Sequence, residues 1–209
     1  MTRLPRFLPL AAATLAALLV AACASEPDRY YTLAAPVGGV AAVPEAVPPV
    51  FVEIGPIALP DRLARPQMVV RGDSAGAQVR VLEKHRWSAS FEKEMRDALA
   101  AGIVARSGAI DVSRTPRQAG QPVWRVTVQL RDFDAVEDSR IDAAFGWTLR
   151  RSDAPRSLHC SWQASEPAGN GIGGVAAGAQ RITARAADAI AGQLAALRAD
   201  PAAACLSGT

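Results

Sequence analysis

The stretch Pro122–Phe133, PVWRVTVQLRDF, has the clearest strand pattern in the chain. Every second residue from Trp124 to Leu130 is apolar, and the residues between them are polar. This period of two predicts a strand with one buried face. The pattern recurs further on, at Phe145, Trp147 and Leu149 and then at Leu158, Cys160 and Trp162. We therefore predict three consecutive antiparallel strands, each with one buried face.

Two helices are predicted, one before and one after these strands. Residues 88–106 carry apolar side chains at three- and four-residue spacing, with Ser88 or Ser90 as N-cap and Gly108 at the end. Residues 174–197 form a longer, alanine-rich helix that Pro201 ends. Short strands are expected within residues 30–33, 50–57, 78–83 and 110–112. This order predicts an α/β (α+β) fold, with a single mixed, largely antiparallel sheet and two main helices packed on it.

The N-terminal residues have the order of an export signal. Arg3 and Arg6 precede a charge-free run from Leu8 to Ala22, which is shorter than the roughly 20 apolar residues that span a bilayer. The run ends in Val20-Ala21-Ala22-Cys23, which resembles the lipobox of bacterial lipoproteins. In a lipobox the cysteine thiol receives a diacylglycerol and becomes the acylated N-terminus. The alternatives are an ordinary secreted protein with a stray cysteine, or a buried core helix.

The lipobox predicts a chain tethered to a membrane by lipid at Cys23, because two or more acyl chains anchor a protein stably. Ala24 and Ser25 follow, without the Asp that signals retention in the inner membrane. The predicted location is the periplasmic face of the outer membrane. The predicted organisation is a signal peptide over residues 1–22, the lipidated Cys, a short strand and a Pro/Gly/Ala-rich linker over 23–49, and a globular domain over 50–209.

The mature chain is nearly neutral. The full sequence has 23 basic and 20 acidic residues, and removing Arg3 and Arg6 with the signal peptide leaves 21 against 20. This balance gives no support for a nucleic-acid partner.

Two cysteines remain in the mature chain besides Cys23, namely Cys160 and Cys205. An even pair in an exported protein predicts a disulfide, and two unpaired thiols are the alternative. A bridge would close a loop of about 45 residues and would stabilise the fold by up to about 4 kcal/mol in the chain-entropy model.

The sequence contains no convincing catalytic or metal-binding motif. The segment 169–174, GNGIGG, fits the spacing of a dinucleotide-binding loop, but no later strand follows the helix that it enters. A flexible glycine loop is the better interpretation. His85 and His159 are the only histidines, and neither lies in a nucleophile motif or a metal-ligand spacing. We therefore predict a protein that is not an enzyme and needs no cofactor or metal.

Three further motifs carry a family resemblance. They are Tyr31-Thr32-Leu33, then Arg65-Pro66-Gln67-Met68-Val69-Val70-Arg71, and the pair Arg86-Trp87. Their order is similar to that of the PqiC family, the auxiliary lipoproteins of ABC-type MCE transport systems. In that family the Arg-Trp pair opens the first long helix. The local order from Pro60 to Pro66 departs from the family pattern, which leaves the roles of Asp61 and Arg62 unassigned.

The resemblance implies a non-enzymatic component of an envelope lipid-transport system. Its partner would be an MCE-domain protein whose rings build a tunnel across the periplasm. The lipoprotein would sit at the outer-membrane end, and the resemblance leaves open that several copies form a homo-oligomeric ring there. Because Arg and Trp are enriched at interface hot spots, the candidate partner-binding residues are Arg65, Gln67, Arg71 and Trp87. The alternative for Trp87 is a place in the core under the first helix.

Two other functions remain open at this stage. A periplasmic lipid carrier would hold a lipid in an apolar pocket of its own, whereas the many alanines predict a small, filled core. A purely structural envelope lipoprotein would have no partner in a transport system.

Overall fold

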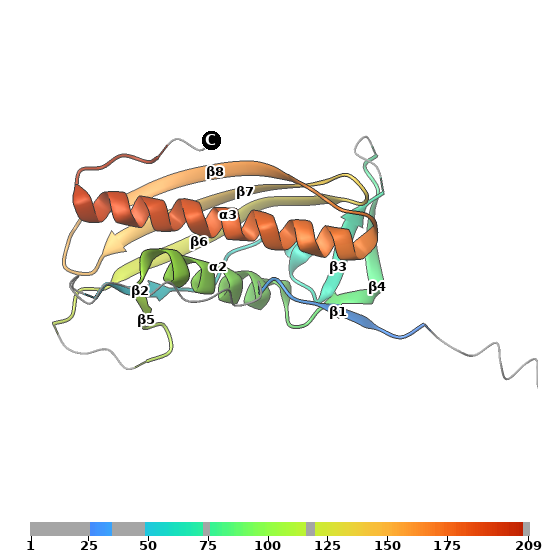
Figure 1. Ribbon diagram of the computed structural model, residues 1–209, viewed down its shortest axis with the longest axis horizontal. Helices are drawn as coiled ribbons and strands as arrows, with labels where there is room; N and C mark the ends of the chain where they lie inside the picture. Colours follow the sequence, from blue (N-terminus) through green and yellow to red (C-terminus); the bar gives the residue numbers. More distant parts are fainter. Residues whose placement is uncertain (1–25, 35–48, 73–75, 116–119, 207–209) are drawn as a thin grey trace, which may run out of the picture.

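The computed structural model describes residues 26–34, 49–72, 76–115 and 120–206. These residues form one mixed sheet with two helices, which is the predicted α+β fold (Figure 1). The lipobox with Cys23 and most of the predicted linker lie outside the described residues. No helix within the described residues is both long and apolar enough to cross a membrane.

The three predicted antiparallel strands are confirmed and are the longest in the sheet. They are β6 (Trp124–Val136), β7 (Arg140–Arg151) and β8 (Ser157–Pro167). β7 pairs with both neighbours along nearly its whole length. The alternating residues of the sequence pattern face the core, because Val126, Val128 and Leu130 are each almost fully buried.

The edge of β6 that does not pair with β7 pairs with two groups of shorter strands. At its N-terminal end it pairs in parallel with β2 (Phe51–Ile54), which in turn pairs with β5 (Ile110–Asp111). At its C-terminal end it meets β3 (Gln67–Arg71), which pairs with β4 (Val79–Trp87). The parallel strand β1 (Arg29–Tyr31) completes this group beside β4. A one-turn 3-10 helix, η1 (Asp61–Leu63), leads into β3.

Both helices lie on the same face of the sheet (Figure 1). Helix α2 (Phe91–Ser107) starts at the N-cap Ser90, whose hydroxyl accepts a hydrogen bond from the Lys93 N–H, and ends at Gly108 with φ 64°. Helix α3 (Gly171–Ala199) crosses over β7 and β8. The two helices touch closely, because a Cβ added at Gly102 would be 2.6 Å from the Ala187 Cβ.

Aromatic side chains fill the space between α2 and the sheet. Phe91 lies 5.3 Å from Trp87 and 5.2 Å from Phe133 between ring centroids. All three side chains are buried in the core.

The structure corrects several predicted boundaries. Arg86 and Trp87 end strand β4 and do not open the helix, because the Trp87 N–H donates to the Pro66 carbonyl at 2.7 Å and the strand continues up to this point. β4 also runs past the predicted limit of residue 83, since β1 and β3 provide pairing partners there. Residues 67–71, for which no strand is predicted from the sequence, form the strand β3.

The second helix begins inside the glycine segment and not at Gly174. Gly171 follows the N-cap Asn170, and its N–H donates to the Asp138 carboxylate at 2.6 Å. Gly174 is required for this entry, because an added Cβ would meet the Gly169 backbone at 2.0 Å. An acidic side chain of the same chain thus occupies the helix N-terminus, where a dinucleotide phosphate would bind.

Candidate functional site

No described helix or strand covers the face of the sheet opposite the two helices along β6, β7 and β8, and we call this face the outer face. Its residues alternate with the buried ones, and the strand register arranges them in rows across the three strands. From one end to the other the rows are Arg125–Arg150–Ser157, Thr127–Thr148–His159, Gln129–Gly146–Ser161, Asp132–Ala144–Gln163 and Asp134–Asp142–Ser165. The outer face is therefore polar throughout, with small residues at its middle.

Three aspartates at one end of the outer face have arginine partners. The pairs are Arg62–Asp132 at 2.6 Å, Arg71–Asp134 at 3.0 Å and Arg140–Asp142 at 2.7 Å. The first two pairs join η1 and β3 to the outer face of β6, whereas Arg140–Asp142 lies within β7. The acidic end is consequently close to neutral.

Two arginines of the outer face are differently placed. Arg131 and Arg150 are exposed, and neither forms an ion pair with any residue in the described ranges. The Arg131 guanidinium lies against the backbone of Gly146, where an added Cβ would be 2.8 Å from its Nε. A planar guanidinium held in this way presents donors for an acceptor on another molecule.

Two hollows lie on the same face, with volumes of about 410 and 380 Å³. The first is lined by Asp132, Asp142, Gln163 and Ser165 together with alanines. The second includes Arg131, Ser161 and Gln163. Polar and charged linings of this kind do not suit the acyl chain of a lipid.

The structure separates the four residues predicted from sequence to bind a partner. Arg65 is exposed in the turn before β3, and Gln67 is half-buried with its amide 3.4 Å from the Glu83 carboxylate. Arg71 is held by Asp134 and also donates to the Gly76 carbonyl. Trp87 is only 5% exposed and packs on Phe91, so its indole is part of the core. Arg65 therefore has the greatest freedom to contact another protein.

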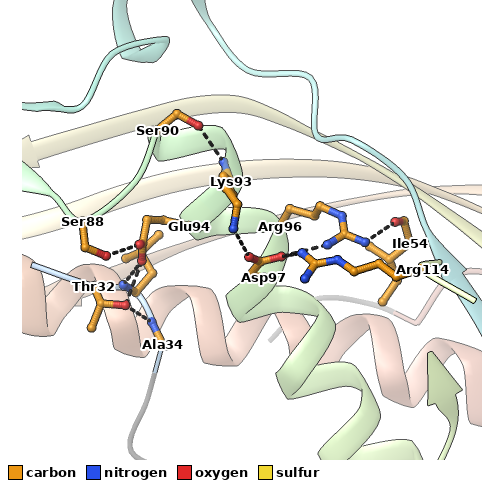
Figure 2. A network of polar contacts seen from close by, with 11 residues as sticks. Thr32, Ala34, Ile54, Ser88, Ser90, Lys93, Glu94, Arg96, Asp97 and Arg114 are labelled. Atoms are coloured by element: carbon orange, nitrogen blue, oxygen red, sulfur yellow. Dashed lines mark hydrogen bonds and ion pairs between the residues drawn. The ribbon is translucent and has the colours of Figure 1, made fainter. Parts of the chain in front are cut away.

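The N-terminal segment is tied to the domain by Glu94 (Figure 2). Its carboxylate accepts hydrogen bonds from the Thr32 hydroxyl and from the Leu33 N–H, both at 2.8 Å, and from the Ser88 hydroxyl. Tyr31 adds a further contact, with its hydroxyl 2.9 Å from His85 Nδ1. The hydrogen bonds to Glu94 attach the segment directly after β1 to helix α2.

Sequence reasoning missed the role of Glu94. The helical pattern places it among the polar residues of α2 that face solvent, yet it is only 9% exposed. Two of its partners, Thr32 and Leu33, lie about 60 positions earlier, and nothing in the local sequence indicates that the segment after β1 packs there. The His85 Nδ1 lies 2.9 Å from the Tyr31 hydroxyl, and His159 is exposed on β8. Within the described residues no group of side chains is arranged as a metal site.

A second polar network in Figure 2 surrounds Asp97 on the same helix. Lys93, Arg96 and Arg114 all lie within 3.0 Å of its carboxylate, and Arg96 also donates to the Ile54 carbonyl. Partial burial by itself raises the pKa of Asp97. The hydrogen bonds from Lys93 and Arg96 and the charge of Arg114 lower it by more, so the pKa lies below its ordinary value. This network joins α2 to β2 and to the segment after β5.

The C-terminal segment that follows α3 is covalently attached to β8. A disulfide joins Cys160 to Cys205, with Cα atoms 5.6 Å apart. The Arg156 guanidinium donates to the carbonyls of residues 201–203, and the buried Gln193 donates to the Ala204 carbonyl. The segment after α3 therefore packs back on the domain.

Comparison with known proteins identifies the class of protein to which this architecture belongs. Residues 31–191 match the family model described as "ABC-type transport auxiliary lipoprotein component". The chain belongs to this family of transport auxiliary lipoproteins. No curated protein matches the sequence.

Two solved structures share the fold. One is titled as an uncharacterized protein, with a TM-score of 0.62 and 17% identity, covering 81% of this chain and 99% of that one. The other is a protein from Xanthomonas campestris, with a TM-score of 0.52 and 14% identity, covering 73% of this chain and 92% of that one. At these identities the likeness concerns the fold alone.

Proposed function

We propose that this protein is an outer-membrane lipoprotein of an MCE-type ABC transport system. It would be anchored through Cys23, dock an MCE-domain protein at the end of a periplasmic tunnel, and assist the passage of phospholipid or other apolar molecules between the membranes. The observation that carries the proposal is the family match over residues 31–191, directly after a lipobox-like segment. A ring of several copies at the tunnel end belongs to the same proposal.

The outer face is the surface that we propose for docking. It is broad and uncovered, and it presents Arg131 and Arg150 without acidic partners among the described residues. Arginines and polar side chains without competing partners favour contact with a second protein. Arg65 is exposed in the turn between η1 and β3 and is a further candidate for the contact.

A carrier function has less physical support. A lipid carrier needs an apolar pocket that encloses most of its ligand. The two hollows described above are open and polar, and the aromatic core between α2 and the sheet is filled. Within the described residues these features favour an adaptor that contacts other proteins.

The test is a crosslinking pull-down from bacterial envelopes with the native lipidated protein. We expect it to recover an MCE-domain protein, and we expect the Cys23→Ala protein to lose this partner because it is no longer held at the membrane. Recovery of only the protein itself and lipid from the native sample would refute docking and favour the carrier.

A pair of charge reversals then tests the surface. Arg131→Glu is expected to reduce recovery several-fold, because it places a carboxylate at the centre of the outer face. Arg198→Glu is the matched control, since Arg198 is exposed in the last turn of α3, on the opposite side of the sheet. Equal recovery of both variants would contradict docking through the outer face.

A further inference from the structure

Exposed apolar side chains gather at one end of the molecule. Five large apolar residues are exposed within the described ranges, and three of them lie in β1 and β4. These three are Tyr30, Val79 and Val81, which are 63%, 42% and 39% exposed. Figure 1 places β1, β3 and β4 together at the end of the molecule where the N-terminal segment enters.

The strand register puts these side chains on one face. Tyr30 pairs with Arg86, which pairs with Gln67, and after a register shift between Gln67 and Met68 the strand pairing places Val69 opposite Val81. The sides are kept across this shift, because Trp87 next to Arg86 and Met68 next to Val69 are both buried in the core. Paired residues in neighbouring strands point to the same side of a sheet, and so do residues two apart in one strand. Tyr30, Val79 and Val81 therefore share a face with the half-buried Val69, which packs on the core, and we call the three exposed residues the apolar patch.

The predicted lipid anchor is tethered close to this patch. Only three positions separate Cys23 from Glu26, the first described residue, and a chain of three residues spans at most about 11 Å. The chain is then fixed to β4, because Asp28 pairs with Lys84 at 3.2 Å and Arg29 lies opposite His85. An acylated Cys23 would thus bring this end of the domain, and no other, to the bilayer surface.

The charges around the patch are balanced. Four ion pairs lie in or beside β1 and β4, namely Arg29–Glu26, Arg80–Glu137, Lys84–Asp28 and Arg86–Glu83. Each of these four cations has an acidic partner, so the surface formed by β1 and β4 is close to neutral. An uncharged, partly apolar surface is the fitting partner.

We propose that the apolar patch lies against the membrane in which Cys23 is anchored, with Tyr30 at the level of the lipid headgroups. Tyrosine suits this position because its ring is apolar and its hydroxyl remains hydrated. Three partly exposed side chains bind a bilayer weakly by themselves, and the acyl chains supply the local concentration that makes the contact persistent. The inference rests on the lipid anchor of the proposed function but not on docking to a tunnel.

Such a contact would define the orientation of the domain. A single flexible tether leaves the domain free to rotate, whereas an anchor together with a patch gives two points of attachment. The β4 strand runs across the direction of β6–β8 at this end (Figure 1), so two points of attachment near β1 and β4 would fix how the long strands lie relative to the membrane.

The test uses the full lipidated protein in phosphatidylcholine vesicles with an environment-sensitive fluorophore at a single introduced cysteine. Val81→Cys places the probe in the patch, and Gln163→Cys places it on the outer face of β8 as the matched control. The other cysteines do not interfere, because Cys160 and Cys205 are joined and Cys23 carries lipid in this preparation. We expect a blue-shifted emission and protection from a water-soluble quencher at residue 81 only.

Three outcomes would overturn the inference, and each is distinguishable from failure of the anchor. Protein that sediments with the vesicles but shows equal quenching at residues 81 and 163 has an anchor and no membrane contact. Protection at residue 81 that requires an MCE-domain protein assigns the patch to that partner. Protection that requires anionic lipid contradicts an uncharged contact. Val79→Cys is a second reporter in case Val81→Cys lowers the melting temperature.

Discussion

The two faces of the long strands β6–β8 have opposite environments although they arise from the same alternation of residues. The inner residues, such as Val128 and Leu130, lie under the helices and exclude water, while Thr127 and Gln129 between them face solvent. A substitution on the inner face should therefore lower the free energy of unfolding more than one on the outer face, because removing buried apolar atoms loses both burial energy and packing. The inner face should therefore govern stability and the outer face should govern contacts with other molecules.

The largest expected effect is at Phe91, at the centre of the inner side. Phe91→Ala removes a ring that contacts Trp87 and Phe133 and should lower the free energy of unfolding by about 3–5 kcal/mol. Urea denaturation measures this change. The control is Thr127→Ala on the outer face, for which we expect a change within about 0.5 kcal/mol. Similar values for the two variants would contradict the difference between the faces.

A smaller effect is expected at the contact between the helices. Gly102→Ala adds a methyl group at a position only 2.6 Å from the Ala187 Cβ, so α2 must move away from α3. We expect a destabilisation of about 1–3 kcal/mol, which is typical of overpacking. Thermal melting should show a lowered midpoint. The double variant Gly102→Ala/Ala187→Gly should recover part of the loss, and no recovery would place the strain elsewhere.

Two aspartates on the helices should respond oppositely to pH. The pKa of Asp97 is lowered from 3.8 in the folded state, so its charge stabilises the fold above pH 3.8, and this contribution disappears as the pH falls through the folded value. Asp97→Asn should cost up to about 1 kcal/mol at pH 7, since exposed ion pairs are weak. The cost should vanish below the folded pKa in urea titrations at several pH values.

Asp188 is the matched comparison for that experiment. Burial raises its pKa above 3.8 despite the charge of Arg106, whose Nη2 lies 2.8 Å from the Asp188 Oδ1. Its ionisation therefore opposes folding, with no effect below pH 3.8 and the full effect above the folded pKa. Asp188→Asn should cost less at pH 7 than Asp97→Asn. The reverse order would contradict the two assigned environments.

The smallest effect is expected at Gly146 on the outer face. An added Cβ meets only the end of the Arg131 side chain, which is flexible and can move. Gly146→Ala should change stability by about 0.5 kcal/mol or less, because alanine also reduces the entropy of the unfolded chain. If docking uses Arg131 as proposed, the same variant should weaken recovery of the partner by moving the guanidinium. A large loss of stability would show that the outer face is packed as tightly as the inner one.

Local patterns in the sequence predicted the elements with strong periodicity. The alternation from Trp124 to Leu130 predicted β6, and the spacing of Phe91, Met95 and Leu99 predicted α2. Short strands were located only approximately. β3 was not recognised within a polar segment, and the end of β4 at Trp87 was interpreted as the start of a helix. In both cases the strand exists because a partner strand supplies its hydrogen bonds, and pairing between distant segments leaves little trace in a single sequence.

The candidate surfaces were predicted less completely than the fold. Arg65, Gln67 and Arg71 were selected by residue type and motif, yet the structure binds Arg71 to Asp134 and places Trp87 in the core. Arg131 and Gly146 were not selected, since their contact depends on the register between β6 and β7. Glu94 was placed among solvent-facing residues because a helical period describes one helix and not what packs against it.

The sequence alone determined the order of the main elements, the buried apolar faces of the long strands and of the two helices, and the lipobox-like segment that predicts export and lipidation. These features follow from local periodicity and from the chemistry of a few adjacent residues. The tertiary structure decided which polar residues are paired, which face of the sheet the two helices leave open, and that Tyr30, Val79 and Val81 share one face of the sheet beside the N-terminal segment. Those results depend on strand register and helix placement, because they bring together residues that lie far apart in the chain.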